Sequence, residues 1–482
     1  MTMKPPVPPA RSPKATAARP NTPRPNAPRS TAPRSTEQRS TEQRSTEQRR
    51  PSSASSQTSS EPTTAPAETN SDGSSGRSAA AVVVTVKRIF AAETGNYFLL
   101  LGTTLFLVAF GLVMVLSSSS IESYLQNDSD FFAAFSKQGL YALIGIPLML
   151  LASRFPATFW KKWAWLFLVI GVCLQLLVFV PGIGFSYGGN TNWIKIGNSF
   201  SAQPSELVKL ALIVWIAWVL WTKASLLDDW RHVLLPIGPV AGIAIGFVLL
   251  GGDLGTGIVM LSIVFGALFF AGIKMRFLIP AAILVAVFGV IFAQGGSSRT
   301  SRISAWLNGC VDVDALAACW QPTHGLWALA SGGVFGVGLG NSKAKWSWLP
   351  EADNDFIFAI IGEELGLIGA IVVLVLFVVL AFSFIRIIRA TDDPFARIVT
   401  SGVMVWIIVQ AIINISVVLG LLPVLGVPLP LISAGGSALI ASLIAIGVVL
   451  SFARNPVRNE DVLVPNSPSA SLSAPRRVRA AR

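Results

Sequence analysis

Ten long apolar stretches dominate the chain from residue 97 onward, and short polar or charged segments separate most of them. They cover residues 97–117, 138–153, 163–181, 205–222, 233–251, 254–273, 277–293, 357–385, 398–422 and 434–452. A helix needs about 20 apolar residues to cross the hydrocarbon core of a bilayer. Some of these stretches are shorter, which tilt or partial re-entry can accommodate. The pattern therefore predicts an all-α polytopic membrane protein with about ten transmembrane helices.

Basic residues in the intervening loops indicate which side of the membrane each loop faces. If the N-terminus is cytoplasmic, the inner loops collect Arg154, Lys161, Lys162, Lys223, Arg231, Lys274, Arg276, Arg386, Arg389 and Arg397. The outer loops are longer in total but collect only Lys137, Lys195, Arg299, Arg302, Lys343 and Lys345. Because cytoplasmic loops carry the excess of Lys and Arg, we expect both termini in the cytoplasm. The loop of about residues 294–355, between helices 7 and 8, is then extracytoplasmic, and a loop of such length is usually functional.

The composition supports the membrane class and shows where the charge lies. Of 482 residues, 52% are hydrophobic and 13% charged, whereas soluble domains carry about 25% charged residues. Residues 1–88 hold 14 basic and 6 acidic side chains and residues 454–482 hold 6 and 2, while the core is balanced at 17 each. Anionic membrane lipids or cytoplasmic partners are the expected counterparts of the basic tails. No basic face is interleaved with aromatic residues, so we expect no nucleic acid partner.

The chain accordingly divides into three regions. Residues 1–88 are rich in Pro, Ser and Arg and repeat the pentapeptide Ser-Thr-Glu-Gln-Arg three times over residues 35–49. Such a segment buries too little apolar surface to offset the entropy of ordering, which predicts a disordered cytoplasmic tail. Residues 89–453 form the predicted membrane domain, and residues 454–482 form a second basic cytoplasmic tail.

Five carboxylates lie within fourteen residues where the long outer loop meets the eighth apolar stretch. They are Glu351, Asp353, Asp355, Glu363 and Glu364. A charged side chain at the centre of a membrane helix costs roughly 2.5–3.5 kcal/mol on insertion scales, so acids near such a position are usually retained for function. This cluster is the strongest indication of chemistry in the chain.

A polar segment at the start of the fourth apolar stretch is a second candidate site. It contains Trp193, Gln203, Ser205, Glu206 and Lys209. Glu206 and Lys209 are three positions apart, so they share a helix face and can pair. Two interpretations stay open. The residues form an ion pair where the helix enters the membrane, or they face a polar cavity and contact a substrate.

Further polar and glycine residues lie at membrane depth. Asp253 follows two glycines between two apolar stretches, where it either caps a helix or points into the bundle. Ser433, Gly435 and Gly436 precede the last apolar stretch in a segment that is also rich in proline. Irregular backbone at this depth is tolerated only where it lines a cavity or is buried in protein, which makes both segments candidates for a site.

Three cysteines are too few for a disulfide framework. Cys173 lies within an apolar stretch and is most simply a small core residue. Cys310 and Cys319 are nine positions apart on the long outer loop. If that loop faces an oxidising exterior they can form a disulfide, and two free thiols are the alternative.

Taken in order, the motifs resemble those of the SEDS family of bacterial cell-wall proteins (shape, elongation, division and sporulation), and most closely its division member. The resemblance covers about residues 90–455. It rests on Gln203-Pro204-Ser205-Glu206 with Lys209, Asp253-Leu254-Gly255-Thr256, Leu339-Gly340-Asn341-Ser342, Leu349-Pro350-Glu351-Ala352 with Asp355-Phe356-Ile357-Phe358, Gly362-Glu363-Glu364-Leu365-Gly366, and Pro428-Leu429-Pro430 with Ile432-Ser433 and Gly435-Gly436. The chain departs from the family where Asp353-Asn354 replace a frequent His-Thr, Gly251-Gly252 a frequent Gln-Pro, and Ala434 a common Tyr.

The resemblance implies a peptidoglycan glycosyltransferase that polymerises lipid II at the outer face of the bacterial cytoplasmic membrane, at the division septum. An acceptor 4-hydroxyl would attack an α-linked anomeric carbon whose leaving group is undecaprenyl diphosphate, and a carboxylate can be the base. The family Asp that matches Asp355 is held to be essential, and the extra Asp353 leaves the choice of base open. The leaving diphosphate needs cations. The resemblance suggests Lys345 for this role, with Lys343 as a second candidate and a divalent cation such as Mg²⁺ or Mn²⁺ as the alternative; the sequence identifies no metal ligand.

The remaining motif residues are expected at the substrate cleft. Glu206, Lys209 and Asp253 would line or brace it, Glu351 and Asp353 would assist Asp355, and Glu363 and Glu364 would orient the following helix. The substrate-binding set also includes Trp193, Gln203, Ser205, Ser433, Gly435 and Gly436.

The resemblance also implies partners, and other functions stay open. The expected partners are lipid II and its undecaprenyl-diphosphate-linked glycan, a class B penicillin-binding transpeptidase (FtsI-like), and other divisome proteins. A transporter that flips lipid II without forming bonds would also need intramembrane charges and broken helices. A divisome scaffold, or an elongation-type paralogue of the same family, would be consistent with the motifs as well.

Overall fold

Each of the ten apolar stretches coincides for most of its length with one helix in the computed structural model. The structure describes residues 94–126, 130–187, 190–196, 200–295, 297–310, 316–346 and 348–454, all within the unit Asp72–Arg482. The ten helices are α2 (Gly95–Gln126), α3 (Ala133–Ala152), α4 (Ala157–Leu177), α5 (Pro204–Thr222), α6 (Trp230–Leu250), α7 (Leu254–Phe270), α8 (Met275–Gln294), α11 (Ile357–Ala390), α12 (Pro394–Val418) and α13 (Gly436–Ala453). The predicted tails, residues 1–88 and all but the first residue of 454–482, lie outside the described residues.

These helices confirm the predicted polytopic class. Among the described residues, nine are long and apolar enough to cross a membrane, and α7 is apolar but shorter, at 17 residues. The short helix η1 (Ala224–Leu226) links α5 to α6. The side of the membrane on which each loop lies, and the cytoplasmic location of both termini, stay predictions.

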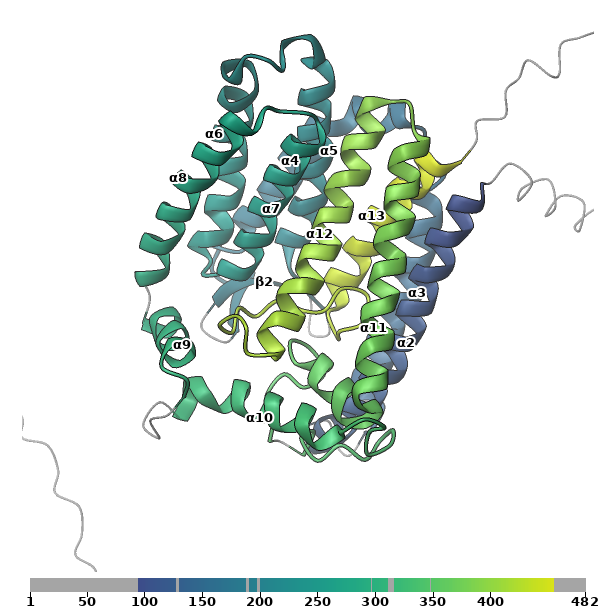
Figure 1. Cartoon of the computed structure of the whole chain (residues 1–482), viewed down its shortest axis with the longest axis vertical. Coiled ribbons are helices and arrows are strands. Elements are labelled where there is room, and N and C mark those ends of the chain that lie inside the picture. The colour runs from purple at the N-terminus through teal and green to yellow at the C-terminus, as the bar shows by residue number, and fades with distance from the viewer. Residues whose placement is uncertain are drawn as a thin grey trace, which may run out of the picture. The chain divides into compact units, whose positions relative to one another are not determined.

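The helices form an inner and an outer group (Figure 1). In their most apolar windows, 78% of α5 and 72% of α12 are buried, against 6% of α8. Helix α12 packs against α5, α7, α11 and α13, whereas α8 packs mainly on α7 and α9 at the edge of the bundle. An apolar helix as exposed as α8 requires a lipid environment, because water would solvate its Ile, Val and Phe side chains poorly. Cys173 of α4 is exposed on the bundle surface, so its prediction as a core residue is wrong.

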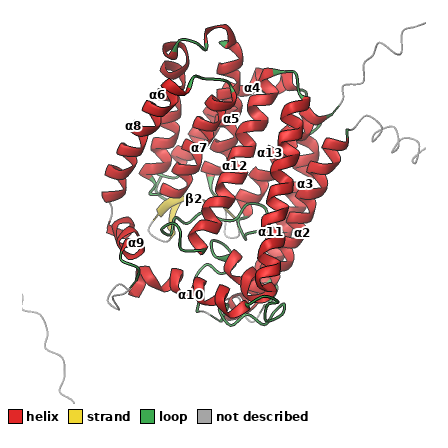
Figure 2. Ribbon diagram, viewed as in Figure 1, coloured by secondary structure: helices red, strands yellow, loops and turns green. Residues whose placement is uncertain are grey.

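A small antiparallel sheet lies in the connection between α4 and α5 (Figure 2). Its strands are β1 (Gly184–Tyr187), β2 (Asn190–Ile196) and β3 (Phe200–Ala202), in the order β1-β2-β3. Thr191 N–H donates to the carbonyl of Gly251 at 2.8 Å, which attaches the sheet to the turn between α6 and α7. The sheet therefore positions the residues around that turn, including Asp253.

The predicted outer loop between α8 and α11 contains two helices, α9 (Ser297–Leu307) and α10 (Leu316–Gly332), which lie across one end of the bundle (Figure 1). A disulfide joins Cys310 to Cys319, so the end of α9 is covalently tied to the start of α10. Trp320 of α10 donates to the carbonyl of Trp348, and Gln321 to that of Pro350. Helix α10 thereby holds the segment that leads to Asp355.

Helix α11 is broken at Gly366, whose φ of 69° and ψ of −167° are not helical. The segment after α10 fills the break: Val337 N–H donates to the carbonyl of Glu363, and Leu367 N–H donates to that of Gly333. These bonds pair backbone groups that the break frees, as a low-dielectric environment requires. A Cβ atom at Gly366 would lie only 2.4 Å from the nitrogen of Gly336.

We expect Gly366→Ala to destabilise the protein, because it adds both left-handed backbone strain and a clash with backbone. The expected loss in the free energy of unfolding is about 1–3 kcal/mol. Thermal unfolding of the purified full chain measures it. Gly289→Ala on α8 is the control, since a Cβ there meets nothing within 4 Å; equal melting temperatures for the two variants would contradict the account of the break.

Candidate active site

The backbone around Asp355 is held by two distant segments. Asn414 of α12 donates its side-chain amide to the carbonyls of Asp355, at 2.7 Å, and of Val427, at 2.8 Å. Ser433 donates its hydroxyl to the carbonyl of Asn354 at 2.7 Å. The segment 419–435, which links α12 to α13, therefore packs directly against the segment that presents Asp355.

Asp355 is partly buried, and other acids lie near its carboxylate. A Cβ added at Gly426 would be 3.6 Å from its Oδ2. Burial raises the pKa of Asp355 to about 7; the charges of Glu351 and Asp253 add to the rise, and Arg302 opposes it. Burial likewise raises the pKa of Asp353, to about 6. At neutral pH Asp355 is therefore poised between its acid and base forms, as a general base requires.

Asp253 both caps a helix and joins the site. Its Oδ1 accepts from Thr256 N–H at 2.8 Å, which makes it the N-cap of α7, and its Oδ2 accepts from the Gln203 amide at 2.9 Å. Burial raises the pKa of Asp253. Its charge also contributes to the raised pKa of Asp355. The 419–435 segment contacts both regions, since a Cβ added at Gly255 would lie 2.6 Å from the carbonyl oxygen of Leu425 and one added at Gly426 would lie 3.6 Å from Asp355 Oδ2.

Glu206 and Lys209 form a buried ion pair of 2.8 Å. Lys209 Nζ also donates to Gln410 Oε1 and lies 4.8 Å from the ring centre of Trp406. Gln410 in turn donates to the carbonyl of Pro428. These contacts brace α5 against α12 and the 419–435 segment. A direct contact of the pair with substrate stays a prediction.

The two lysines expected at the diphosphate differ in environment. Lys343 is exposed. Lys345 is buried, and its Nζ donates to the carbonyls of Ser117, at 3.2 Å, and Gly340, at 2.6 Å, and lies 3.5 Å from Glu364. In this conformation Lys345 joins the loop before α11 to α2, so its expected contact with a diphosphate stays a prediction.

Glu363 and Glu364 fix the same loop. Glu363 accepts from the hydroxyl of Ser342, from Lys343 N–H at 2.9 Å and from Ala344 N–H at 3.3 Å. Glu364 accepts from the hydroxyl of Ser117 on α2 at 2.5 Å. Both carboxylates therefore position a loop and a neighbouring helix.

The other predicted site residues surround these groups. Ser433 is buried, and its hydroxyl accepts from Leu429 N–H at 2.8 Å. Ser205 is buried at the start of α5 without a hydrogen-bond partner for its Oγ in the described part of the chain. Glu351 accepts from the Asn354 amide, which places it beside Asp355. The remaining three are partly exposed: Trp193 on β2, and Gly435 and Gly436 at the start of α13.

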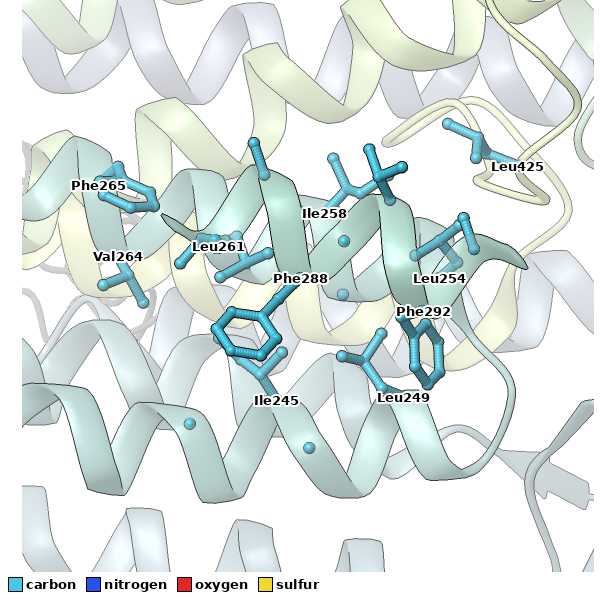
Figure 3. Close-up of a pocket in the computed structure, with 18 of the residues that line it drawn as sticks. Ile245, Leu249, Leu254, Ile258, Leu261, Val264, Phe265, Phe288, Phe292 and Leu425 are labelled. Carbon is cyan, nitrogen blue, oxygen red and sulfur yellow. The ribbon is translucent and has the colours of Figure 1, made fainter. Parts of the chain in front are cut away.

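A large apolar cavity of about 1030 Å³ lies among α6, α7 and α8 (Figure 3). Ile245, Leu261 and Phe288 lie along its walls, and Leu422–Leu425 of the 419–435 segment also line it. Asn190 and Gly252 line it as well, next to Asp253. The cavity thus reaches the turn that carries one of the site carboxylates.

Arg299 and Arg302 are the only charged residues among the described ones that line this cavity. They belong to none of the sequence motifs and stand out in the sequence only as charges of the outer loop. Their spacing with Ile303, at i, i+3 and i+4 on α9, is the signal that could have placed all three on one helix face.

The described residues offer no ready metal centre. No group of three His, Cys, Asp or Glu side chains within them is arranged to hold an ion. The divalent cation expected at the leaving diphosphate stays a prediction.

Comparison with known proteins identifies the family to which this chain is related. The family model described as "Cell cycle protein", which covers FtsW, RodA and SpoVE, matches residues 97–457. The probable peptidoglycan glycosyltransferase FtsW of Mycobacterium tuberculosis is 38% identical over 360 residues, 75% of this chain and 68% of that protein. Stage V sporulation protein E of Bacillus subtilis is 37% identical over 362 residues, 75% of this chain and 98% of that protein.

Solved structures agree on the fold. The rod shape determining protein RodA of Thermus thermophilus is 26% identical, with a TM-score of 0.55 over 75% of this chain and 97% of its own. A chain of a peptidoglycan synthase complex that coordinates polymerization and crosslinking is 24% identical, with a TM-score of 0.61 over 74% and 98%. The fold is thus that of a polytopic membrane protein, and the family model assigns it to the cell cycle proteins. The chain belongs to the FtsW/RodA/SpoVE family, which confirms the SEDS resemblance.

We predict that Glu363→Ala lowers the free energy of unfolding by about 2–4 kcal/mol, because it leaves the partly buried N–H of Lys343 and the buried N–H of Ala344 without an acceptor. Glu363→Gln keeps one acceptor oxygen and should recover a large part of the loss. Thermal unfolding of both variants measures this difference. An Ala variant as stable as the Gln variant would show that Glu363 does not hold the loop.

Proposed function

We propose that the protein is a peptidoglycan glycosyltransferase that polymerises lipid II into glycan strands. The names of the relatives support this activity. The observation that carries it in this chain is the placement of Asp355: a carboxylate with a pKa raised to about 7 lies against the 419–435 segment, and Leu422–Leu425 of the same segment line the large apolar cavity. A lipid-linked sugar needs both features, since its prenyl chain requires an apolar site and its sugar a polar one.

In this mechanism Asp355 is the general base. Its carboxylate accepts the proton of the acceptor's 4-hydroxyl as that oxygen attacks the anomeric carbon of the donor. Asn414 and Ser433 hold the backbone on either side of the base, so its position depends on α12 and the 419–435 segment. Glu351 and Asp353 raise the pKa of Asp355, which favours proton uptake.

The cavity supplies the site for one prenyl chain. Its volume of about 1030 Å³ and its Leu, Ile, Val and Phe lining suit a long isoprenoid. Because α8 forms one wall and is largely exposed, a chain can enter sideways from the bilayer. A flippase would share this apolar path, but it would not require a carboxylate poised as a base.

We also propose a class B penicillin-binding transpeptidase (FtsI-like) as the partner, and the division septum as the place of action. A structural relative that belongs to a peptidoglycan synthase complex supports the partner. Curated relatives named FtsW support the division role over an elongation role. Other divisome proteins would be bound as part of the same assembly.

Asp355→Asn should reduce lipid II polymerisation by roughly 10²- to 10⁴-fold, which is the usual contribution of a general base. Gel analysis of glycan products measures this, with purified lipid II and the full chain in complex with its transpeptidase. Asp392→Asn, just beyond the far end of α11, is the control and should polymerise normally. Undiminished product from Asp355→Asn would refute the base, and translocation of labelled lipid II without polymer by the wild-type complex would favour a flippase.

The rate of polymerisation should rise with pH through a midpoint near 7. A base works only when deprotonated, and the pKa of Asp355 is raised to about 7. Glu351→Gln removes a neighbouring negative charge, so it should lower that pKa and move the midpoint to lower pH. The pH–rate profiles of wild type, Glu351→Gln and the Asp392→Asn control measure the shift. A midpoint that Glu351→Gln leaves in place would argue against Asp355 as the titrating group.

A further inference from the structure

The charge on the cavity wall is confined to one place. Its lining residues from α6, α7 and α8 are apolar or glycine, whereas Arg299 and Arg302 of α9 bring two positive charges and, among the described lining residues, no acid accompanies them. A ligand that matches this distribution has a long apolar chain and a compact anionic head. A prenyl diphosphate has both.

Arg299 is held at the end of α8. Its Nη1 donates to the carbonyl of Phe292 at 3.4 Å, and its guanidinium lies 4.4 Å from the ring centre of Phe292. Phe292 is itself a wall residue of the cavity (Figure 3). The arginine is thereby directed along the wall, and this one long hydrogen bond leaves its other N–H donors for a ligand.

Arg302 lies one turn further along α9 and faces the same cavity. It is partly buried, and within the described residues no hydrogen bond or ion pair occupies its guanidinium. Its positive charge lowers the pKa of Asp355, against the effect of the surrounding acids. Arg302 is thus electrostatically linked both to the cavity and to the proposed base.

We propose that Arg299 and Arg302 bind the diphosphate of the prenyl-linked donor and stabilise it as the leaving group. This inference rests on the proposed function and assigns the cavity between α6, α7 and α8 to the donor. Two guanidinium groups on one face of α9 can each present paired N–H donors to phosphate oxygens.

The reaction balances with these groups. The acceptor's 4-oxygen forms a bond to the donor's anomeric carbon while the bond from that carbon to the diphosphate oxygen breaks. The proton of the 4-hydroxyl passes to Asp355, and the electron pair of the broken bond stays on the diphosphate. Negative charge therefore grows where the two arginines lie, and fixed cations at that point lower the barrier.

The donor assignment follows from this charge development. In an inverting reaction the base and the leaving group lie on opposite sides of the anomeric carbon. The acceptor's diphosphate stays bonded to its own sugar and gains no negative charge, so cations beside it would not lower the barrier. Arginines that bind the donor should therefore affect kcat as well as binding, whereas arginines that bind the acceptor should affect KM alone.

A binding experiment tests the site without using the reaction. A fluorescent geranylgeranyl diphosphate is titrated into the full chain in nanodiscs of neutral lipid, with geranylgeraniol as the competitor that lacks the anion. We expect Arg299→Gln/Arg302→Gln to bind the diphosphate roughly 10- to 100-fold more weakly, since two charge-assisted contacts are lost, and geranylgeraniol to bind as in wild type. Arg276→Gln, at the opposite end of α8, is the control and should bind both ligands normally.

The outcomes separate this inference from the proposed function. Equal diphosphate affinity in wild type and the double Gln variant overturns the arginine site even if the wild type polymerises lipid II. Lost affinity supports it even if no polymer forms, and the proposed function alone then fails. Displacement of the probe by phosphatidylglycerol as effectively as by unlabelled prenyl diphosphate would identify a phospholipid site and overturn the proposal.

Kinetics add a readout that altered folding would not reproduce. With melting temperatures matched to wild type, Arg302→Gln should lower kcat for lipid II polymerisation, and Arg302→Lys, which keeps the charge but loses the paired donors, should recover part of it. A kcat unchanged in Arg302→Gln would contradict a role at the leaving group.

Discussion

The break of α11 at Gly366 is the constraint on which the rest of the site depends. Within a bilayer every backbone N–H and C=O needs a partner, and the segment after α10 supplies partners for Glu363, Glu364, Leu367 and Ile368. That segment could not lie so close if Gly366 carried a side chain. The break therefore fixes the end of the long loop against the bundle and sets the position of the part of α11 between Asp355 and the break.

Side-chain contacts also hold the long loop and the backbone at Asp355 in place. Glu363 and Glu364 draw the loop that contains Lys345 onto α11 and α2, while Asn414 and Ser433 hold the backbone at Asp355 from the other side. Asp355 is thus fixed by backbone contacts, and in the described structure no hydrogen bond satisfies its carboxylate. Such an arrangement keeps a base rigid in position yet available for a proton.

The sequence predicted the helices well because a run of about 20 apolar residues rarely forms anything but a membrane span. It also made Asp355 and Asp253 candidate site residues, since acidic side chains near membrane depth are usually retained for a function. It could not show that Lys345 pairs with Ser117, 228 positions away, or that Arg299 and Arg302 face a cavity built from three other helices. The sequence did not predict the strands β1 to β3, because each is short and lies in a polar segment between two membrane spans.

In the proposed mechanism the donor sugar, the base and the prenyl cavity form one continuous site. A cryo-EM map of the full chain with its transpeptidase partner, bound to lipid II whose 4-hydroxyl is blocked, would show whether they do. We expect density for the prenyl chain between α6, α7 and α8, with the sugar beside Asp355. A sugar bound away from Asp355, with the prenyl chain on another face of the bundle, would contradict the account.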